Sequence, residues 1–272
     1  MTLKALVFGA NGQLGRELVN LLEPDSGVGH AQASITDAPA VDRLIDEREP
    51  EVVFNCAAYN AVDRAESESD AAHEVNAEGP RILAAACRRH GVALVHFSTN
   101  FVFDGKHDQP YIEADEPSPL SVYASSKLAG ERNVLEVGAH VLVVRTAAVF
   151  GGPQSFPMRI LERARSGQPL RVVSDQKVNP TYARDLAAAA LELAGQGTAG
   201  IIHAVNQGCI GFDGFARATL EAFDRPETVE SVSSEAYPTP ARRPLNGCLA
   251  TTRFHPLRPW RAALNEWAEG RR

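Results

Sequence analysis

The chain has 272 residues, and its 27 basic and 34 acidic side chains give a formal net charge of −7. An acidic chain is not expected to bind nucleic acid through the phosphates, because that mode needs a basic surface, and no apolar run approaches the roughly 18 residues of a membrane helix. The four cysteines are widely spaced and form no CxxC pair, which favours reduced thiols in a cytoplasmic protein over a disulfide framework or a zinc site.

The first part of the chain alternates between apolar runs and segments with helical spacing. Ala5–Phe8 predicts a buried strand and Gln13–Leu22 a helix, whereas residues 22–37, where a second strand is expected, contain no clear apolar run. That strand is therefore expected to be short or degraded.

The same alternation continues to about residue 150. Further strands are predicted at Val52–Asn55, Val92–Phe97 and Val141–Val144, and helical spacing covers Ala65–His90 with a break near Gly79-Pro80. Continuously apolar strands separated by helices indicate a parallel sheet covered on both faces. The fold class is therefore α/β, a Rossmann-type doubly wound sheet.

After Phe150 the sequence pattern changes to short elements separated by Gly- and Pro-containing turns. We expect a cofactor-binding domain over residues 1–150 and a smaller α/β substrate lobe over 151–272. The two are expected to be interleaved, with part of the second returning to the main sheet.

A glycine-rich turn follows the first predicted strand and opens the first predicted helix. Its three glycines, Gly9, Gly12 and Gly15, form a G-x-x-G-x-x-G pattern. Such a turn lets the backbone approach a pyrophosphate at a helix N-terminus; the alternative is an ordinary strand-to-helix turn. No acidic residue that would bind the adenosine ribose is evident about 20 residues later, so the choice between NAD and NADP stays open.

A tyrosine and a lysine four residues apart lie in the amphipathic stretch from Ser121 to Glu136. This spacing puts Tyr123 and Lys127 on one helical face. A nearby ammonium is expected to lower the pKa of the phenol, and such a tyrosine can protonate an alkoxide as it forms from a ketone. By itself the pair could also be an exposed tyrosine and a solvated lysine.

Hydroxyl side chains end the third predicted strand. Ser98 and Thr99 lie at its carboxyl end, where ligands bind in parallel sheets, and either could hydrogen-bond a substrate carbonyl. A hydroxyl, Tyr123 and Lys127 beside a dinucleotide loop form a constellation for hydride transfer.

Together with these motifs, other segments resemble one family. They are Phe8–Gly15, Asn55–Glu66, Ser98–Gly105, Pro119–Glu131, Asp175–Gln176, Pro180–Thr181 and Tyr237–Pro244. Over essentially its whole length the chain resembles the extended short-chain dehydrogenases and, within them, the dTDP-4-dehydrorhamnose reductases. Tyr237–Pro244 is distinctive of that group.

The resemblance implies reduction of the C4 ketone of a dTDP-4-keto-6-deoxy sugar, with dTDP-4-dehydro-L-rhamnose as the default substrate. NADP(H) is the implied cofactor, with NAD(H) as the alternative, and Thr99, Tyr123 and Lys127 are the implied catalytic residues. Besides Tyr123 and Lys127, the implied cofactor contacts are Gly9, Gly12, Gln13, Leu14, Gly15, Ser34, Ile35, Ala57, Ala58 and Tyr59.

The resemblance also implies a nucleotide-sugar cleft between the lobes. Its expected contacts are Asn60, Thr99, Asn100, Ala148, Arg242 and Arg243. An arginine there could bind the diphosphate bidentately, although a solvated surface pair is the alternative.

Four residues depart from the family pattern. Asn100 replaces an aspartate, which keeps an acceptor but removes the charge. Ala148 replaces a tryptophan, which opens the sugar subsite. Asn60 stands where threonine is common, and Ser34 where aspartate is common. These changes leave the reaction class intact and the identity of the sugar open.

Other functions remain as alternatives. One is a 4-ketoreductase for another dTDP-deoxysugar in antibiotic or surface-polysaccharide biosynthesis, and another is a non-catalytic NADP-binding regulatory subunit. An epimerase or dehydratase is disfavoured, because dehydratases usually carry an acid where Asn100 stands. The histidines show no metal-binding spacing, so no metal site is predicted, and the protein is expected to be a monomer or homodimer.

Overall fold

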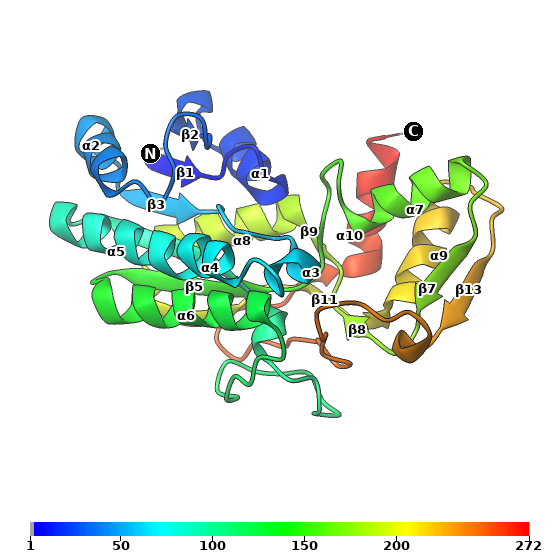
Figure 1. The fold of residues 1–272 in the computed structure, drawn as a ribbon. Helices are drawn as coiled ribbons and strands as arrows, with labels where there is room; N and C mark the ends of the chain where they lie inside the picture. Colours follow the sequence, from blue (N-terminus) through cyan, green and yellow to red (C-terminus); the bar gives the residue numbers. More distant parts are fainter. Residues whose placement is uncertain (1–2, 272) are drawn as a thin grey trace.

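The computed structural model describes residues 3–271. Its main sheet contains six parallel strands in the order β10-β5-β4-β3-β1-β2 (Figure 1). These strands are β1 (Ala5–Phe8), β2 (Gly27–Val28), β3 (Val52–Asn55), β4 (Ala93–Thr99), β5 (Val141–Thr146) and β10 (Gly200–His203). The predicted Rossmann-type α/β fold is confirmed.

Helices cover both faces of this sheet (Figure 1). Successive side chains of a strand point to opposite faces, so the apolar strands supply two separate cores. One face packs against α1 (Gln13–Leu21) and α8 (Ala183–Gly195), and the other against α2 (Ala38–Arg48), α5 (Gly79–His90) and α6 (Val122–Val137). Burial of both faces explains why the strands have no polar alternation.

Two weak points of the sequence pattern have structural counterparts. The expected second strand is β2, only two residues long and preceded by the 3₁₀ turn η1 (Pro24–Ser26). The helical stretch is interrupted next to the predicted break near Gly79-Pro80: α5 begins at Gly79, and Pro80 lies in its first turn, where a missing N–H is tolerated. The irregularity lies one turn earlier, in the π-helical η2 (Glu74–Glu78), which follows α3 (Val62–Ala65) and α4 (Ser69–His73).

The sheet has a topological switch point between β1 and β3, because the chain continues outward from these neighbours in opposite directions. The turns that follow the two strands touch there. A Cβ on Gly9, which has a φ of +78°, would lie 2.5 Å from the backbone nitrogen of Ala57. Glycine is therefore required at this position, and switch points of this kind are where open α/β sheets bind ligands.

The second lobe lies beside the carboxyl end of the sheet (Figure 1). Its helices are α7 (Phe156–Arg165), α9 (Phe212–Ala222) and α10 (Trp260–Glu269). They enclose an aromatic core that includes Phe150, Phe215 and Trp267. Aromatic side chains bury large areas, so a small lobe can be stabilised by few residues.

Short strand pairs and the 3₁₀ turn η4 (Ser234–Ala236) complete this lobe, whereas the 3₁₀ turn η3 (Asn100–Val102) directly follows β4 of the main sheet. The pairs are β6 (Val149–Phe150) with β9 (Thr181–Tyr182), β7 (Leu170–Val173) with β13 (Val229–Val232), β8 (Lys177–Val178) with β12 (Ile210–Gly211), and β11 (Asn206–Gln207) with β14 (Leu257–Pro259). Between them, α8 and β10 return to the main sheet.

The prediction of four reduced thiols is wrong for one pair. Cys209 and Cys248, 39 residues apart in sequence, form a disulfide with a Cα–Cα distance of 5.9 Å, within the usual range for a disulfide. Cys56 and Cys87 are free. Sequence spacing could not reveal this pair, because the two cysteines come from segments that meet only in the folded lobe.

Within residues 3–271, the helices are all too short or too polar to cross a membrane.

Candidate active site

The glycine turn lies between β1 and α1, as the sequence predicts, and the fold places it at the switch point. Gly12 is the N-cap of α1 and no side chain caps this helix, so its first-turn N–H groups face the turn without a side-chain acceptor. A side chain on Gly15 would overlap the carbonyl of Gly9, which fixes the close packing of helix and strand. Gln13 bridges to the second lobe, since its Oε1 accepts from the Gly152 N–H at 3.0 Å.

The side chains of three expected cofactor contacts, Ser34, Ile35 and Leu14, contact other parts of the protein. The Ser34 hydroxyl lies 2.8 Å from the Thr36 hydroxyl. The Ile35 side chain is buried in the core against Gly79, where a Cβ would lie 2.6 Å from its Cδ1. Leu14 packs against the core on the α1 side of the sheet. These contacts leave mainly backbone at these positions to face a cofactor.

Residues Ala57, Ala58, Tyr59 and Asn60 form the turn after β3, opposite the glycine turn. The Asn76 side chain holds this turn, because its Oδ1 accepts from the Tyr59 N–H at 2.8 Å and its Nδ2 donates to the Tyr59 carbonyl at 3.1 Å. The Tyr59 hydroxyl donates to Glu68, so its ring extends toward α4. Sequence analysis missed Asn76, although π-helical turns are often found at functional sites.

The proposed catalytic residues come from β4 and α6. Ser121 caps α6, accepting from the Ala124 N–H at 3.3 Å, and the helix then carries Tyr123 and Lys127 on adjacent turns. The Lys127 Nζ donates to the Phe97 carbonyl at 2.7 Å, which ties α6 to β4 two residues before Thr99. The Tyr123 ring packs edge-on against Phe101, with centroids 5.8 Å apart.

Burial dominates the electrostatics of this pair. It raises the pKa of Tyr123 to about 12, opposed by the neighbouring Thr99 side chain. The predicted lowering of the phenol pKa is therefore wrong in this structure, where the Lys127 ammonium bonds to a carbonyl. Burial also lowers the pKa of Lys127 to about 8, opposed by Glu131 and Cys56. Tyr123 is thus a protonated acid at neutral pH.

A buried ion pair lies one helical turn beyond Lys127. Glu131 and Arg145 are only 1% and 2% exposed, and their closest atoms are 2.7 Å apart. The Arg145 guanidinium also lies over the Phe103 ring, 5.1 Å from its centroid. This pair was not predicted from the sequence. It places the Glu131 carboxylate on the same helix as Lys127, one of the proposed catalytic residues.

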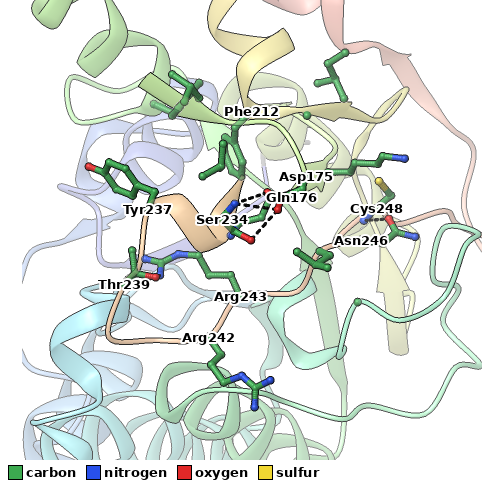
Figure 2. Close-up of a pocket in the computed structure, with 18 of the residues that line it drawn as sticks. Asp175, Gln176, Phe212, Ser234, Tyr237, Thr239, Arg242, Arg243, Asn246 and Cys248 are labelled. Atoms are coloured by element: carbon green, nitrogen blue, oxygen red, sulfur yellow. Dashed lines mark hydrogen bonds between the residues drawn. The ribbon is translucent and has the colours of Figure 1, made fainter. Parts of the chain in front are cut away.

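A cleft of about 1670 Å³ separates the lobes. Of the predicted site residues, only Gln13, Arg242 and Arg243 line it; Tyr123 and Thr99 do not. Tyr123 is 9% exposed. The second lobe contributes Asp175, whose carboxylate accepts from the Ser234 N–H and hydroxyl (Figure 2).

The two arginines differ in their contacts. Arg243 is bound bidentately to Asp63 of α3, at 3.0 and 2.8 Å. The arginine also lowers the pKa of that carboxyl. This ion pair ties the Tyr237–Pro244 segment to the cofactor-binding lobe. Arg242 is exposed, and Figure 2 shows its side chain extending away from Asp175 and Ser234.

The three departures expected among the nucleotide-sugar contacts, Asn60, Asn100 and Ala148, are not part of the cleft lining. Asn100 is only 2% exposed and donates from Nδ2 to the Gly247 carbonyl at 2.8 Å. Ala148 is half-buried and has a φ of +40°. Among residues 3–271, no group of three or more His, Cys, Asp or Glu side chains is arranged to hold a metal ion.

Comparisons with known proteins cover almost the whole chain. Residues 3–271 match the family model described as the RmlD substrate binding domain. A dTDP-4-dehydrorhamnose reductase of Mycobacterium tuberculosis is 41% identical, over 96% of this chain and 91% of the relative. A probable dTDP-4,6-dihydroxy-2-methyloxan-3-one 4-ketoreductase of Streptomyces antibioticus is 39% identical, over 96% and 93%.

Solved structures agree with these sequence matches. The dTDP-4-dehydrorhamnose reductase of Bacillus anthracis, solved in complex with NADP, has a TM-score of 0.95 and 30% identity, covering 99% of this chain and all of that one. The corresponding enzyme of Clostridium acetobutylicum has a TM-score of 0.94 and 34% identity, covering 97% and 98%.

Proposed function

The chain belongs to the RmlD family of dTDP-4-dehydrorhamnose reductases, and we propose that it performs the family's reaction with the residues described above. It is an NAD(P)H-dependent oxidoreductase that reduces the C4 ketone of a nucleotide-linked 4-keto-6-deoxy sugar, with dTDP-4-dehydro-L-rhamnose as the substrate. The 41% identity over 96% of the chain carries this conclusion. A 4-ketoreductase for another dTDP-deoxysugar is the second candidate, because a relative with such a name is 39% identical over 96% of the chain. None of the relatives described above is named as a regulatory subunit.

The glycine turn fits a dinucleotide. The uncapped N-terminus of α1 offers N–H groups and a positive dipole to a pyrophosphate. No side chain at Gly9 or Gly15 obstructs the approach. The backbone of the Ala57–Tyr59 turn lies directly opposite, held by Asn76. We assign the phosphates to the first turn and the nicotinamide half to the second.

When bound, NADPH supplies the hydride that attacks C4 of the sugar. Tyr123 gives its proton to the oxygen of the former carbonyl, so that an alcohol forms and the phenolate remains. Because burial keeps the phenol protonated, the acid is present before the reaction starts. Water then restores the proton. Lys127 bonds to the Phe97 carbonyl and so holds α6, which carries Tyr123, against β4. The Thr99 side chain lies beside the phenol and positions it for proton transfer to the ketone oxygen.

The cleft provides basic side chains that can bind an anionic ligand, although the protein as a whole is acidic. Arg242 is exposed and lines the cleft, so its guanidinium is available for the substrate diphosphate. Arg243 acts indirectly, by holding the segment in place through Asp63. We propose a cytoplasmic location, which suits a reaction that draws on NADPH and a sugar nucleotide, and leave a monomer or a homodimer open.

A direct assay tests the function. Purified protein is mixed with NADPH and a panel of dTDP-4-keto-6-deoxy sugars, and loss of nicotinamide absorbance is followed. Oxidation is expected to be fastest with dTDP-4-dehydrorhamnose. Tight NADP binding without oxidation by any sugar would contradict the enzyme assignment and favour a regulatory role.

The proton donor is tested separately. Tyr123→Phe should abolish turnover and leave the affinity for NADPH nearly unchanged, because only the hydroxyl is removed. A variant that keeps more than about a tenth of the wild-type rate would refute Tyr123 as the acid.

A further inference from the structure

Asn100 lies beside the catalytic threonine but does not face the cleft. It is the first residue of η3, and it is 2% exposed. Its amide makes one bond to each lobe: the Nδ2 donates to the Gly247 carbonyl at 2.8 Å, and the Oδ1 accepts from the Thr99 hydroxyl at 3.3 Å. The two partners, Thr99 and Gly247, are 148 residues apart in the sequence.

The orientation of this amide follows from its partners. A backbone carbonyl can only accept a hydrogen bond, so the NH₂ group must face Gly247. The amide oxygen then faces Thr99, and an amide oxygen can only accept. The Thr99 hydroxyl must therefore be the donor, while its oxygen accepts from the Phe101 N–H at 3.1 Å. The proton and one of the two lone pairs of the Thr99 hydroxyl are thus given a direction.

Gly247 is shaped for this contact. A Cβ at this position would overlap the Asn100 amide, so only glycine lets the carbonyl approach. Its own N–H donates to the Lys177 carbonyl at 2.8 Å, and its neighbours Asn246 and Cys248 line the cleft (Figure 2). The segment that holds Asn100 is therefore part of the cleft wall.

We infer that Asn100 is a positioning residue, which couples the seating of the Asn246–Cys248 segment to the direction of the Thr99 hydroxyl. This inference rests on the proposed function. An aspartate could not play this part when ionised, because a carboxylate has no proton to donate to the Gly247 carbonyl. The departure from the family pattern at this position is thereby explained by a contact with the second lobe instead of with the sugar.

The test compares Asn100→Asp and Asn100→Leu with wild type in the NADPH oxidation assay between pH 5.5 and 8.5. At pH 8 both variants should lose about tenfold to 100-fold in kcat, because a misdirected Thr99 hydroxyl no longer positions the Tyr123 acid beside it, and such a misplacement is felt in the transition state. The KM for NADPH should change little. As pH falls, Asn100→Asp should recover relative to wild type, because the protonated carboxyl regains the donor. Asn100→Leu should not recover.

Asn133→Asp is the matched control. The Asn133 amide of α6 also donates to a backbone carbonyl, that of Ala77, at 3.0 Å, but it lies away from Thr99. This variant should lose stability without a pH-dependent loss of kcat. The inference is refuted if Asn100→Asp and Asn100→Leu keep kcat within about twofold of wild type. It is equally refuted if the Asp variant shows no recovery at low pH, or if Asn133→Asp behaves like it.

Thermal unfolding without ligands separates failure of the inference from failure of the function. The Tm deficit of Asn100→Asp should shrink as pH falls, whether or not any sugar is reduced, since the Gly247 bond is present in the free protein. A wild-type protein that oxidises no NADPH would sink the proposed function while this deficit still reports on the bond. A shrinking Tm deficit together with unchanged kcat would show a purely structural bond and would refute the positioning role.

Discussion

The buried ammonium of Lys127 is predicted to lower the stability of the protein near neutral pH. This side chain is 3% exposed, and burial lowers its pKa from 10.5 to about 8. A lysine whose pKa is depressed in the folded state destabilises that state wherever it is charged, and the effect fades as pH rises from the folded to the unfolded pKa. The relevant window is therefore about pH 8 to 10.5.

The magnitude follows from the size of the shift. A difference of about 2.5 pKa units corresponds to about 3 kcal/mol of destabilisation at pH 7. Most of it, about 2 to 3 kcal/mol, should be lost by pH 10. Glu131 and Cys56 oppose the shift; the buried His96 is held neutral by its own burial and by Lys127.

Lys127→Met removes the titration and retains the shape of the stem. The free energy of unfolding is measured by urea denaturation for both proteins from pH 7 to 10. Relative to the variant, wild type should gain about 2 to 3 kcal/mol over this range. The variant also loses the bond to the Phe97 carbonyl, but that loss is the same at every pH. A difference between the two proteins that does not change with pH would refute a buried, charged Lys127.

Three further predictions follow from tertiary contacts. Arg145→Met should lower the free energy of unfolding, measured by urea denaturation, by about 3 to 5 kcal/mol, because the Glu131 carboxylate is left buried without its partner. Adding Glu131→Leu should restore most of this stability. An Arg145→Met protein within about 1 kcal/mol of wild type would contradict the prediction. Asp63→Asn should raise the KM for the sugar nucleotide about threefold and leave the KM for NADPH unchanged. The effect should be smaller at high salt, because the Asp63–Arg243 pair is partly exposed. Equal changes in both KM values would point to general damage. Replacing Cys209 and Cys248 by serine should lower the free energy of unfolding by up to about 4 kcal/mol, the chain-entropy value for a loop of 39 residues. Adding a dithiol should destabilise the wild-type protein by the same amount and leave the stability of the variant unchanged.

The local features of the protein are determined by the sequence alone. The strands β1, β3, β4 and β5 form where continuous apolar runs predict them, because each run is long enough to be buried on both faces. The glycine turn is equally local, since three glycines between a strand and a helix permit only a few backbone paths.

Other features depend on contacts between distant segments. Asp63 and Arg243 are 180 residues apart and Asn100 and Gly247 are 147 apart, so no spacing rule could pair them. Nor does any local pattern distinguish the side chain that binds Arg243 from the other acids of α3 and α4.

The protonation of Tyr123 shows the same division. Its spacing of four residues from Lys127 places both side chains on one helical face, and this proximity predicts a lowered pKa for the Tyr123 phenol. The fold instead buries the phenol and directs the ammonium to the Phe97 carbonyl, so the pKa rises to about 12. Sequence determines which groups are neighbours along a helix, because helical spacing is a local property. Only the tertiary structure decides how much water each group keeps, and desolvation is the largest cause of the shifts at both Tyr123 and Lys127.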